Sequence, residues 1–259
     1  MIKGNVWEEY IKPSKLFGNL YFIGIRAVCT HLIDTGEGLI IIDPGYSESL
    51  HIIVNNIWEL GFKTSDIKYI IVSHAHLDHM DSVAALVAMT GAKTFIGKDD
   101  LPLLTGEKFH YALNFFKPDV LLEDGDIISL GNTNIKCVST PGHTDGTMSF
   151  FFDVTDGEKT YRAGMFGGAG TNTLRKDFLT KNNLPFENRQ KFIDSINKIK
   201  NEKVELFLGN HLANNHTEEK LSLLNTQTEN PFIQNSQQEW EQFLDSRLTL
   251  INNIIQYNL

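Results

Sequence analysis

The sequence carries no excess of positive charge. Lys and Arg number 23 against 32 Asp and Glu, which gives a formal net charge of -9 at pH 7. A protein that binds a nucleic-acid backbone needs a basic surface, because neutralising phosphates supplies most of the affinity. We find no basic stretch that could form such a surface, and we therefore expect no nucleic-acid partner.

Long apolar runs are missing as well. No uninterrupted apolar segment reaches the roughly 18 residues that a membrane-spanning helix needs, so we expect no membrane partner. The opening MIKGNVWEEYIKPSKLFGN has neither the apolar core nor the small-residue cleavage site of a secretory signal. The sequence as it stands predicts a cytoplasmic protein.

Cysteine is scarce, and so are linkers and repeats. The two cysteines, Cys29 and Cys137, lie in strand-like stretches without metal-ligand spacing, and we expect buried free thiols rather than a disulfide. The chain of 259 residues is 41% hydrophobic and 21% charged, as in ordinary folded proteins. With no linker-like segment, the sequence predicts a single domain over 1–259 and leaves the oligomeric state open.

The first half of the chain reads as short β-branched runs divided by turns. Segments 19–24, 28–35 and 38–45 predict consecutive antiparallel strands, and 66–73 predicts a further buried strand. Two helices are expected, over 48–61 and 81–91. The apolar face expected for the first helix consists of Leu50, Ile53, Val54, Ile57 and Leu60, and Asp81 or Ser82 is the expected N-cap of the second.

The second half repeats this style. Strands are predicted at 93–97, 134–144, 147–154, 159–165 and 204–211. Helices are predicted over 186–201 and, at the C-terminal end, about 236–257. The apolar face of the last helix consists of Trp240, Phe243, Leu244, Leu248 and Ile251. The element order predicts an α/β (α+β) domain of two β-rich halves, each sheet faced by helices.

The stretch SHAHLDHMDS, from Ser73 to Ser82, concentrates metal-binding side chains. His74 and His76 are two residues apart after a strand, so their imidazoles point the same way and can hold one ion. Asp78 and His79 follow where the chain turns toward a helix, and they aim at a second point nearby. This spacing is specific enough to predict a metal site.

Two more histidines follow strands in the second half: His143 in TPGHTDG and His211 in LGNH. Together with the cluster they form two sets of three ligands, as a catalytic zinc pair with open positions requires. Single histidines elsewhere are more often structural. We assign His31, His51 and His216 to that class, and we keep His110 open as a residue that lines the site.

The segments HAHLDH, PGHTDG, GNH and LIIIDPG together resemble the metallo-β-lactamase superfamily of hydrolases, over 19–216. The resemblance implies an αββα sandwich of two mixed β-sheets flanked by helices, with two Zn²⁺ ions at one edge of the sheets. It further implies that His74, His76 and His143 hold the first zinc. Asp78, His79 and His211 would hold the second.

A finer resemblance is to the subclass B3 β-lactamases, through KPSKLFGNLYFIG, FKPDVLLEDGDIISLG and GHTDGTMSFFF. The segment RAGMFGGAGTNT lacks the bridging aspartate of glyoxalase II and the lactonases, and the cysteine of the B1 enzymes, which is the B3 pattern. Several B3 enzymes hold the drug carboxylate with serines in this loop. Here Met165, Gly167 and Gly168 stand instead, with Thr171, Asn172 and Thr173 as candidate substitutes.

The chemistry expected of such a site is hydrolysis. Two zinc ions lower the pKa of a bridging water to near 7, and the resulting hydroxide attacks a carbonyl carbon. Asp78 is the expected catalytic residue, a ligand that also orients the hydroxide. Asp43, in LIIIDPG, is expected to position a ligand histidine or to tie a loop. The aromatic segment 100–119 either walls the cleft through Phe109, Tyr111, Phe115 and Phe116 or forms a structural helix.

The leading hypothesis is therefore a dizinc hydrolase of a small molecule with a hydrolysable carbonyl. Subclass B3-like β-lactam hydrolysis is the first candidate, weak because the serine anchor is missing. Gly167→Ser is expected to lower KM, provided that the loop tolerates a Cβ at this position. A lactonase or a glyoxalase II-like thioesterase is the alternative among hydrolases, and a mononuclear iron persulfide dioxygenase the alternative of another class. Antibiotic resistance would follow from the first candidate, although a cytoplasmic enzyme shields the cell wall poorly.

Overall fold

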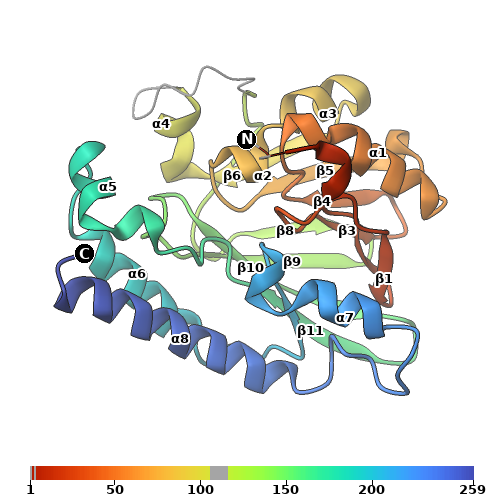
Figure 1. Cartoon of the computed structure of the whole chain (residues 1–259). Helices are drawn as coiled ribbons and strands as arrows, with labels where there is room; N and C mark the ends of the chain where they lie inside the picture. Colours follow the sequence, from red (N-terminus) through yellow and green to blue (C-terminus); the bar gives the residue numbers. More distant parts are fainter. Residues whose placement is uncertain (1, 3, 106–115) are drawn as a thin grey trace.

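The computed structural model describes residue 2 and residues 4–105 and 116–259. Two β-sheets pack face to face and helices cover their outer surfaces (Figure 1). In Figure 1, α1 (Leu50–Glu59) and α3 (Val83–Thr90) lie on one side of the paired sheets, and α6 (Asn188–Ile199) and α8 (Ser236–Gln256) lie on the other. This arrangement confirms the αββα sandwich.

The first sheet contains seven strands in their order along the chain. They are β1 (Ser14–Phe17), β2 (Leu20–Phe22), β3 (His31–Asp34), β4 (Leu39–Ile42), β5 (Ile67–Val72), β6 (Lys93–Gly97) and β7 (Val120–Leu122). The pairs from β1 to β4 are antiparallel, and the pairs from β4 to β7 are parallel. The sheet is therefore mixed, as expected.

The second sheet has the strand order β12-β11-β10-β9-β8. Its strands are β8 (Ile127–Leu130), β9 (Thr133–Ser139), β10 (Met148–Thr155), β11 (Thr160–Met165) and β12 (Leu206–Leu208). Only the pair of β11 with β12 is parallel. The predicted strands of this half are confirmed, while β8 and the edge strands β1 and β7 of the other sheet were not predicted.

The remaining helices are short. They are α2 (Leu77–Met80), α4 (Leu101–Leu104), α5 (Lys176–Lys181) and α7 (Thr217–Leu223). Single 3₁₀ turns are η1 (Val6–Glu9), η2 (Ser47–Ser49), η3 (Thr64–Asp66), η4 (Lys98–Asp100), η5 (Asn172–Leu174) and η6 (Leu212–Asn214). Among the helices of the described part, none combines the length and the apolar composition that a bilayer-spanning segment requires.

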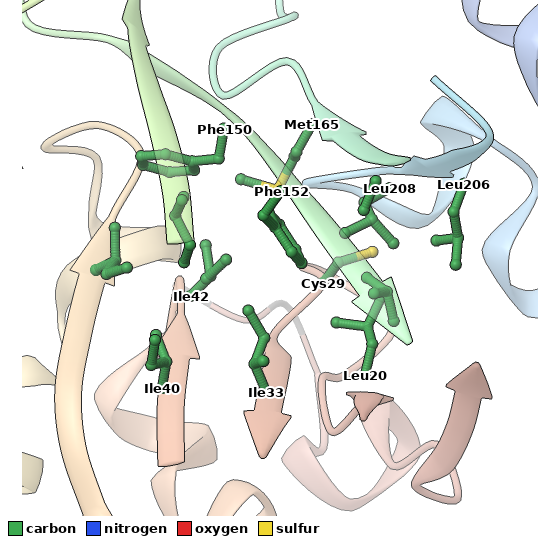
Figure 2. Packing of buried hydrophobic residues seen from close by; sticks show 14 of the residues in the cluster. Leu20, Cys29, Ile33, Ile40, Ile42, Phe150, Phe152, Met165, Leu206 and Leu208 are labelled. Atoms are coloured by element: carbon green, nitrogen blue, oxygen red, sulfur yellow. The ribbon is translucent and has the colours of Figure 1, made fainter. Parts of the chain in front are cut away.

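The apolar run LIII of β4 shows how the layers form. Ile40 and Ile42 face the second sheet and pack in the central core with Phe150, Phe152 and Met165 (Figure 2). Leu39 and Ile41 point the other way, into the core beneath α1 and α3. Because both faces are covered, the strand has no polar position. Each of these large side chains contributes about 1.5–3 kcal/mol by its burial.

The last helix covers the outer face of the second sheet. The ring of Trp240 lies 6.0 Å from that of Phe151 on β10 and 5.3 Å from that of Phe207 on β12. The predicted apolar face is confirmed: Trp240, Phe243, Leu244 and Ile251 are buried, and Leu248 packs against them partly buried. The two cysteines are free and buried, as expected.

Two local predictions were confirmed in outline. Helix α1 buries Ile53 and Ile57, with Leu50 and Leu60 packed partly buried against the same core, while Val54 is partly exposed and Ile52 and Asn56 are buried in addition. The helix turns this face inward because the Asn56 amide donates to the carbonyl of Ile23 (2.9 Å), a bond that an apolar pattern does not reveal. Ser82 occupies the N-cap position of α3, but its hydroxyl donates to the carbonyls of Pro44 and Gly45 instead of capping the helix.

Candidate metal centre

Three chain segments bring the predicted ligands to one edge of the sandwich. Segment 73–79 follows β5 and carries four of them, two just before and two within α2. His143 lies in the loop between β9 and β10, and His211 lies between β12 and η6. The six residues are more than 130 positions apart at the extremes, so the fold alone brings them together.

The six side chains form two groups. The ligand atoms of His74, His76 and His143, the first triad, all lie within 4.8 Å of one another. The same holds for Asp78, His79 and His211, the second triad. The triads adjoin, since the rings of His74 and His79 are 4.2 Å apart. The structure thus groups the residues as predicted, while metal binding itself stays a prediction.

The first triad is oriented by uncharged partners. His74 Nδ1 lies 3.0 Å from Ser73 Oγ, and His143 Nδ1 donates to the carbonyl of Gly170 (2.8 Å). These bonds leave the Nε2 atoms of both rings facing inward. His143 Nε2 lies 3.0 Å from His76 Nδ1, so the free ring nitrogens converge on one point.

The second triad is oriented by a carboxylate and a carbonyl. His79 Nδ1 donates to Asp43 Oδ2 (2.9 Å), and His211 Nδ1 donates to the carbonyl of Ala27 (2.9 Å). Asp78 Oδ2 lies 3.3 Å from His79 Nε2 and 3.5 Å from His211 Nε2. The three ligand atoms therefore also face a common point.

This donor set fits zinc. A metal-binding histidine usually donates its second ring N–H to a carboxylate or a carbonyl, as His79, His143 and His211 do here. His74 Nε2 is buried without a hydrogen-bond partner among the described residues. Leaving such a nitrogen unpaired costs about 1–3 kcal/mol, which a bound cation would offset. Five imidazoles and one carboxylate, three ligands to a point, are what catalytic zinc sites use.

The charge states differ between the triads. Burial lowers the pKa of His76 to about 4, and burial with neighbouring imidazoles lowers the pKa values of His74 and His143 well below the ordinary range. Burial opposes a charge on His79 too, yet Asp78 and Asp43 raise its pKa to about 10. Burial alone would raise the pKa of Asp78, but the imidazoles hold it well below its ordinary value. The first triad is neutral and the second is ionic.

Asp43 supports both triads. It is fully buried, and its carboxylate accepts hydrogen bonds from Ser73 N (2.7 Å), Ser73 Oγ (2.6 Å) and His79 Nδ1. Because Ser73 Oγ donates to Asp43, it accepts the bond from His74 Nδ1. Asp43 therefore holds one of the predicted ligand histidines, as expected: its carboxylate bonds His79 directly and reaches His74 through Ser73 Oγ.

The glycine-rich loop after β11 does not meet the condition on which the Gly167→Ser prediction depended, namely room for a Cβ. A Cβ at Gly167 would lie 1.9 Å from the carbonyl oxygen of Met148, and one at Gly168 would lie 2.9 Å from the Cβ of His143. Met165 is fully buried in the central core (Figure 2). None of these positions can present a hydroxyl to a substrate.

The candidate substitutes lie in η5 or just before it. Thr173 is buried, and its hydroxyl donates to the carbonyl of His143 (3.0 Å), so it braces a ligand. Asn172 is exposed.

A small cavity of about 20 Å³, room for about one water, lies beside the first triad. Its lining includes His76, Asp99, Leu103, His143, Thr173, Phe178, Leu184 and Asn188.

The structure tests only part of the prediction that aromatic residues of segment 100–119 wall the cleft. Phe116 is buried in the core beneath α1 and α3, so it does not wall the cleft. Phe109, His110, Tyr111 and Phe115 lie outside the described residues. The histidines assigned to structural roles stay outside the triads: His31 is buried on β3 with Nε2 bound to the carbonyl of Gly209, His51 lies on α1, and His216 precedes α7.

One buried carboxylate near the site was missed. Asp100 accepts hydrogen bonds from segments on both sides of the first triad. The signal in the sequence was its place shortly after a buried strand: Asp100 is the third residue after β6, whereas Asp43 follows β4 directly.

Comparison with known proteins agrees with this geometry. Residues 24–156, just over half of the chain, match the family model described as the metallo-beta-lactamase superfamily. The solved structure of BJP-1, a subclass B3 metallo-beta-lactamase of Bradyrhizobium japonicum, matches with a TM-score of 0.85 and 27% identity over 97% of this chain and 96% of that one. The FEZ-1 metallo-beta-lactamase from Legionella gormanii matches with a TM-score of 0.88 and 27% identity, over 96% of this chain and 97% of that one.

Curated relatives match over shorter stretches. The probable polyketide biosynthesis zinc-dependent hydrolase PksB of Bacillus subtilis (strain 168) is 30% identical over 108 residues, which are 39% of this chain and 44% of PksB. A hydroxyacylglutathione hydrolase of Francisella tularensis subsp. novicida (strain U112) is 30% identical over 103 residues, 38% of this chain and 36% of the relative. Each alignment spans less than half of the relative's length.

Proposed function

Because this chain belongs to the metallo-beta-lactamase superfamily of hydrolases, we propose that it uses two zinc ions to hydrolyse an amide or ester bond in a small molecule. Hydrolysis of β-lactams in the manner of the subclass B3 enzymes is the leading activity. The observation that supports it best is the pair of adjoining triads, which have the predicted B3 ligand set and lie on a fold shared with B3 enzymes along nearly the whole chain.

The residues of the chain have distinct parts in this reaction. Zinc, when bound, supplies a water that ionises near pH 7 and a Lewis acid for the carbonyl oxygen. Asp78 stays ionised, and its carboxylate lies at the junction of His79 and His211, where it can accept a hydrogen bond from the attacking water. Asp43 and Ser73 fix the ring of one histidine in each triad. Fixed ligands keep the reacting groups in line for attack.

Capture of an anionic β-lactam should be weak. Among the described residues around the centre, Lys191 is paired with Asp145 (2.9 Å) and Arg26 with Glu218 (2.8 Å), and the loop after β11 offers no serine. A missing charge-assisted hydrogen bond costs about 1.5–3 kcal/mol, roughly ten- to a hundredfold in binding. We therefore expect detectable turnover with a high KM.

A thioesterase is the second candidate. The names of two curated relatives, a hydroxyacylglutathione hydrolase and a hydrolase of polyketide biosynthesis, favour it. The end of β11 argues against it, because Gly164 and Met165 provide no bridging carboxylate there. A lactonase would share that difficulty. An iron-dependent persulfide dioxygenase would bind one iron per chain instead of two zincs.

The test is metal analysis followed by a hydrolysis panel. Purified protein reconstituted with zinc should hold about two equivalents and should cleave a chromogenic β-lactam faster than a lactone or a thioester. Less than one equivalent of zinc, or one equivalent of iron, would refute the dizinc centre. Protein that holds two zinc ions but cleaves the thioester fastest would support the dizinc centre and would make a thioester, not a β-lactam, the proposed substrate.

Location and resistance are separate predictions. The cytoplasmic location predicted from the sequence is tested by fractionation of the native host. Antibiotic resistance is tested by expressing the chain with and without an added export signal and measuring survival on β-lactams. We expect protection only when the protein is exported.

A further inference from the structure

Asp100 is a carboxylate with an unusual set of partners. It ends η4, directly after β6, and it is fully buried. Its Oδ2 accepts the N–H of Ala75 (2.7 Å) and the hydroxyl of Thr144 (2.9 Å), and its Oδ1 accepts the N–H of Gly146 (2.7 Å). All three partners are donors, so only an acceptor with two oxygens satisfies them.

The partners of Asp100 flank the first triad. Ala75 lies between His74 and His76, and Thr144 directly follows His143. A single carboxylate oxygen therefore joins the two chain segments that carry all three histidines. These segments are far apart in the sequence and belong to different sheets, since one follows β5 and the other precedes β10.

The backbone around Asp100 is shaped for this contact. A Cβ at Gly146 would lie 2.3 Å from Asp100 N and 2.7 Å from Asp100 Cβ. A Cβ at Gly97 would lie 1.9 Å from the carbonyl oxygen of Gly146. Glycine at both positions allows η4 to approach the loop of His143 closely enough for the hydrogen bonds to form.

The second triad is held differently. Its histidines depend on Asp43 and on the carbonyl of Ala27, whereas the hydrogen bonds of Asp100 within the described residues go to Ala75, Thr144 and Gly146. Loss of Asp100 should therefore loosen one triad and spare the other.

We propose that Asp100 is a positioning residue that sets the geometry of the first triad alone, by clamping the segment 74–76 to the loop after His143. The proposal rests on the zinc centre of the proposed function. Partners that orient metal ligands typically contribute about 10- to 100-fold in metal affinity. The Asp100 clamp should have an effect of that size on the first site and almost none on the second.

The test measures zinc affinity one site at a time. His211→Ala removes a ligand of the second triad, and His143→Ala removes one of the first, so each background leaves one triad complete. Asp100→Asn is added to each background, and zinc affinity is measured by competition with a chromophoric chelator. We expect a loss of about 10- to 100-fold in the His211→Ala background and of less than about threefold in the His143→Ala background.

Two further variants probe the clamp without changing Asp100, and Thr144→Val is the milder of the two. Thr144→Val removes one of the three hydrogen bonds of Asp100, and Gly146→Ala wedges the clamp apart. Both should lower zinc affinity only in the His211→Ala background, with the thermal unfolding of the metal-free chain recorded alongside. The control is Asp119→Asn: Asp119, exposed just before β7, likewise accepts a backbone N–H and a threonine hydroxyl, both from Thr94 (2.8 Å each). It should leave both affinities unchanged.

The outcomes separate the clamp from the proposed function. Equal losses in the two backgrounds, or no loss in the His211→Ala background, would overturn the clamp while leaving the dizinc hydrolase intact. A wild-type chain that binds no zinc would overturn both. A site-selective loss together with an inactive hydrolysis panel would support the clamp and refute the proposed reaction.

Discussion

The two triads stand side by side, but they are built on different principles. The first has three neutral imidazoles held by a hydroxyl, a carbonyl and a glycine-rich loop. The second contains the carboxylate of Asp78 and includes His211, whose side chain is 38% exposed, whereas that of His79 is 1% exposed. The first triad is held by close packing of uncharged groups, whereas the second includes a charged carboxylate.

The difference predicts how each site responds to change. A site of neutral ligands depends on geometry, because nothing but the direction of lone pairs attracts the ion. A site with a carboxylate keeps part of its attraction when its geometry loosens. Substitutions that alter packing should therefore harm the first triad more, and substitutions that alter charge should harm the second more.

The largest effects are expected from deleting one ligand of each triad. His76→Ala and His211→Ala should each lower zinc content from about two to about one per chain. Each should also reduce kcat/KM by about 10²- to 10³-fold, because a catalytic metal contributes several kcal/mol to the barrier. Zinc analysis and steady-state kinetics measure both. Activity retained in His211→Ala would mean that other residues complete the second site.

The fold should survive both deletions. His76 and His211 are partly exposed, and their loops keep their backbone hydrogen bonds. Circular dichroism and the unfolding midpoint of the metal-free variants provide the control. If the unfolding midpoint of a variant fell sharply, its loss of activity could not be assigned to the missing ligand.

The next effect concerns the shared support. Asp43→Asn should lower zinc affinity at both triads by about 10- to 100-fold, since Asp43 holds His79 directly and His74 through Ser73. Losing a buried acceptor of three bonds should also lower stability by about 1–3 kcal/mol. Chelator competition in the two single-triad backgrounds distinguishes this variant from Asp100→Asn. Loss at only one triad would show that the support is not shared.

A smaller effect is expected in the glycine-rich loop. Gly167→Ser should destabilise the chain by about 1–3 kcal/mol, because its Cβ would lie 1.9 Å from the carbonyl oxygen of Met148 and overpacking carries that cost. It should not lower KM for a β-lactam. Chemical denaturation and kinetics on one β-lactam test both statements. A lower KM at unchanged stability would show that the loop yields and that the serine reaches the substrate.

The smallest effects belong to the rims of the two sites. Lys191 near the first triad is in a partly buried ion pair, and Arg26 near the second is in an exposed one. Each substitution to Ala should change KM for an anionic β-lactam by less than about fivefold, because such pairs contribute little. Measuring KM at low and at high salt completes the test. A shift of tenfold or more in either variant would identify that cation as the carboxylate anchor.

The ligand set could be predicted because its information is local. The pattern His-x-His-x-Asp-His follows a strand, and His143 and His211 follow strands that end at the same edge. Strand ends that share an edge bring such residues together whatever the loops do. The grouping of the six residues could therefore be predicted from strand ends together with the family resemblance, while metal binding by them stays a prediction.

The supports of the ligands could not be predicted in this way. Asp100 reaches Ala75 and Gly146 across 25 and 46 residues, and Asn56 reaches Ile23 across 33. A lone acid or amide in a loop or helix carries no pattern that identifies its partner. The strands β1, β7 and β8 were missed for a different reason, since they have three or four residues with partly exposed faces.

The shared carboxylate of Asp43 also makes the two sites thermodynamically dependent on each other. An ion in the second triad fixes His79, which fixes Asp43, Ser73 and in turn the ring of His74. Part of the ordering that the first triad needs is then already in place. We expect zinc to load with positive cooperativity, and reciprocity requires that each ion strengthens the binding of the other by the same factor.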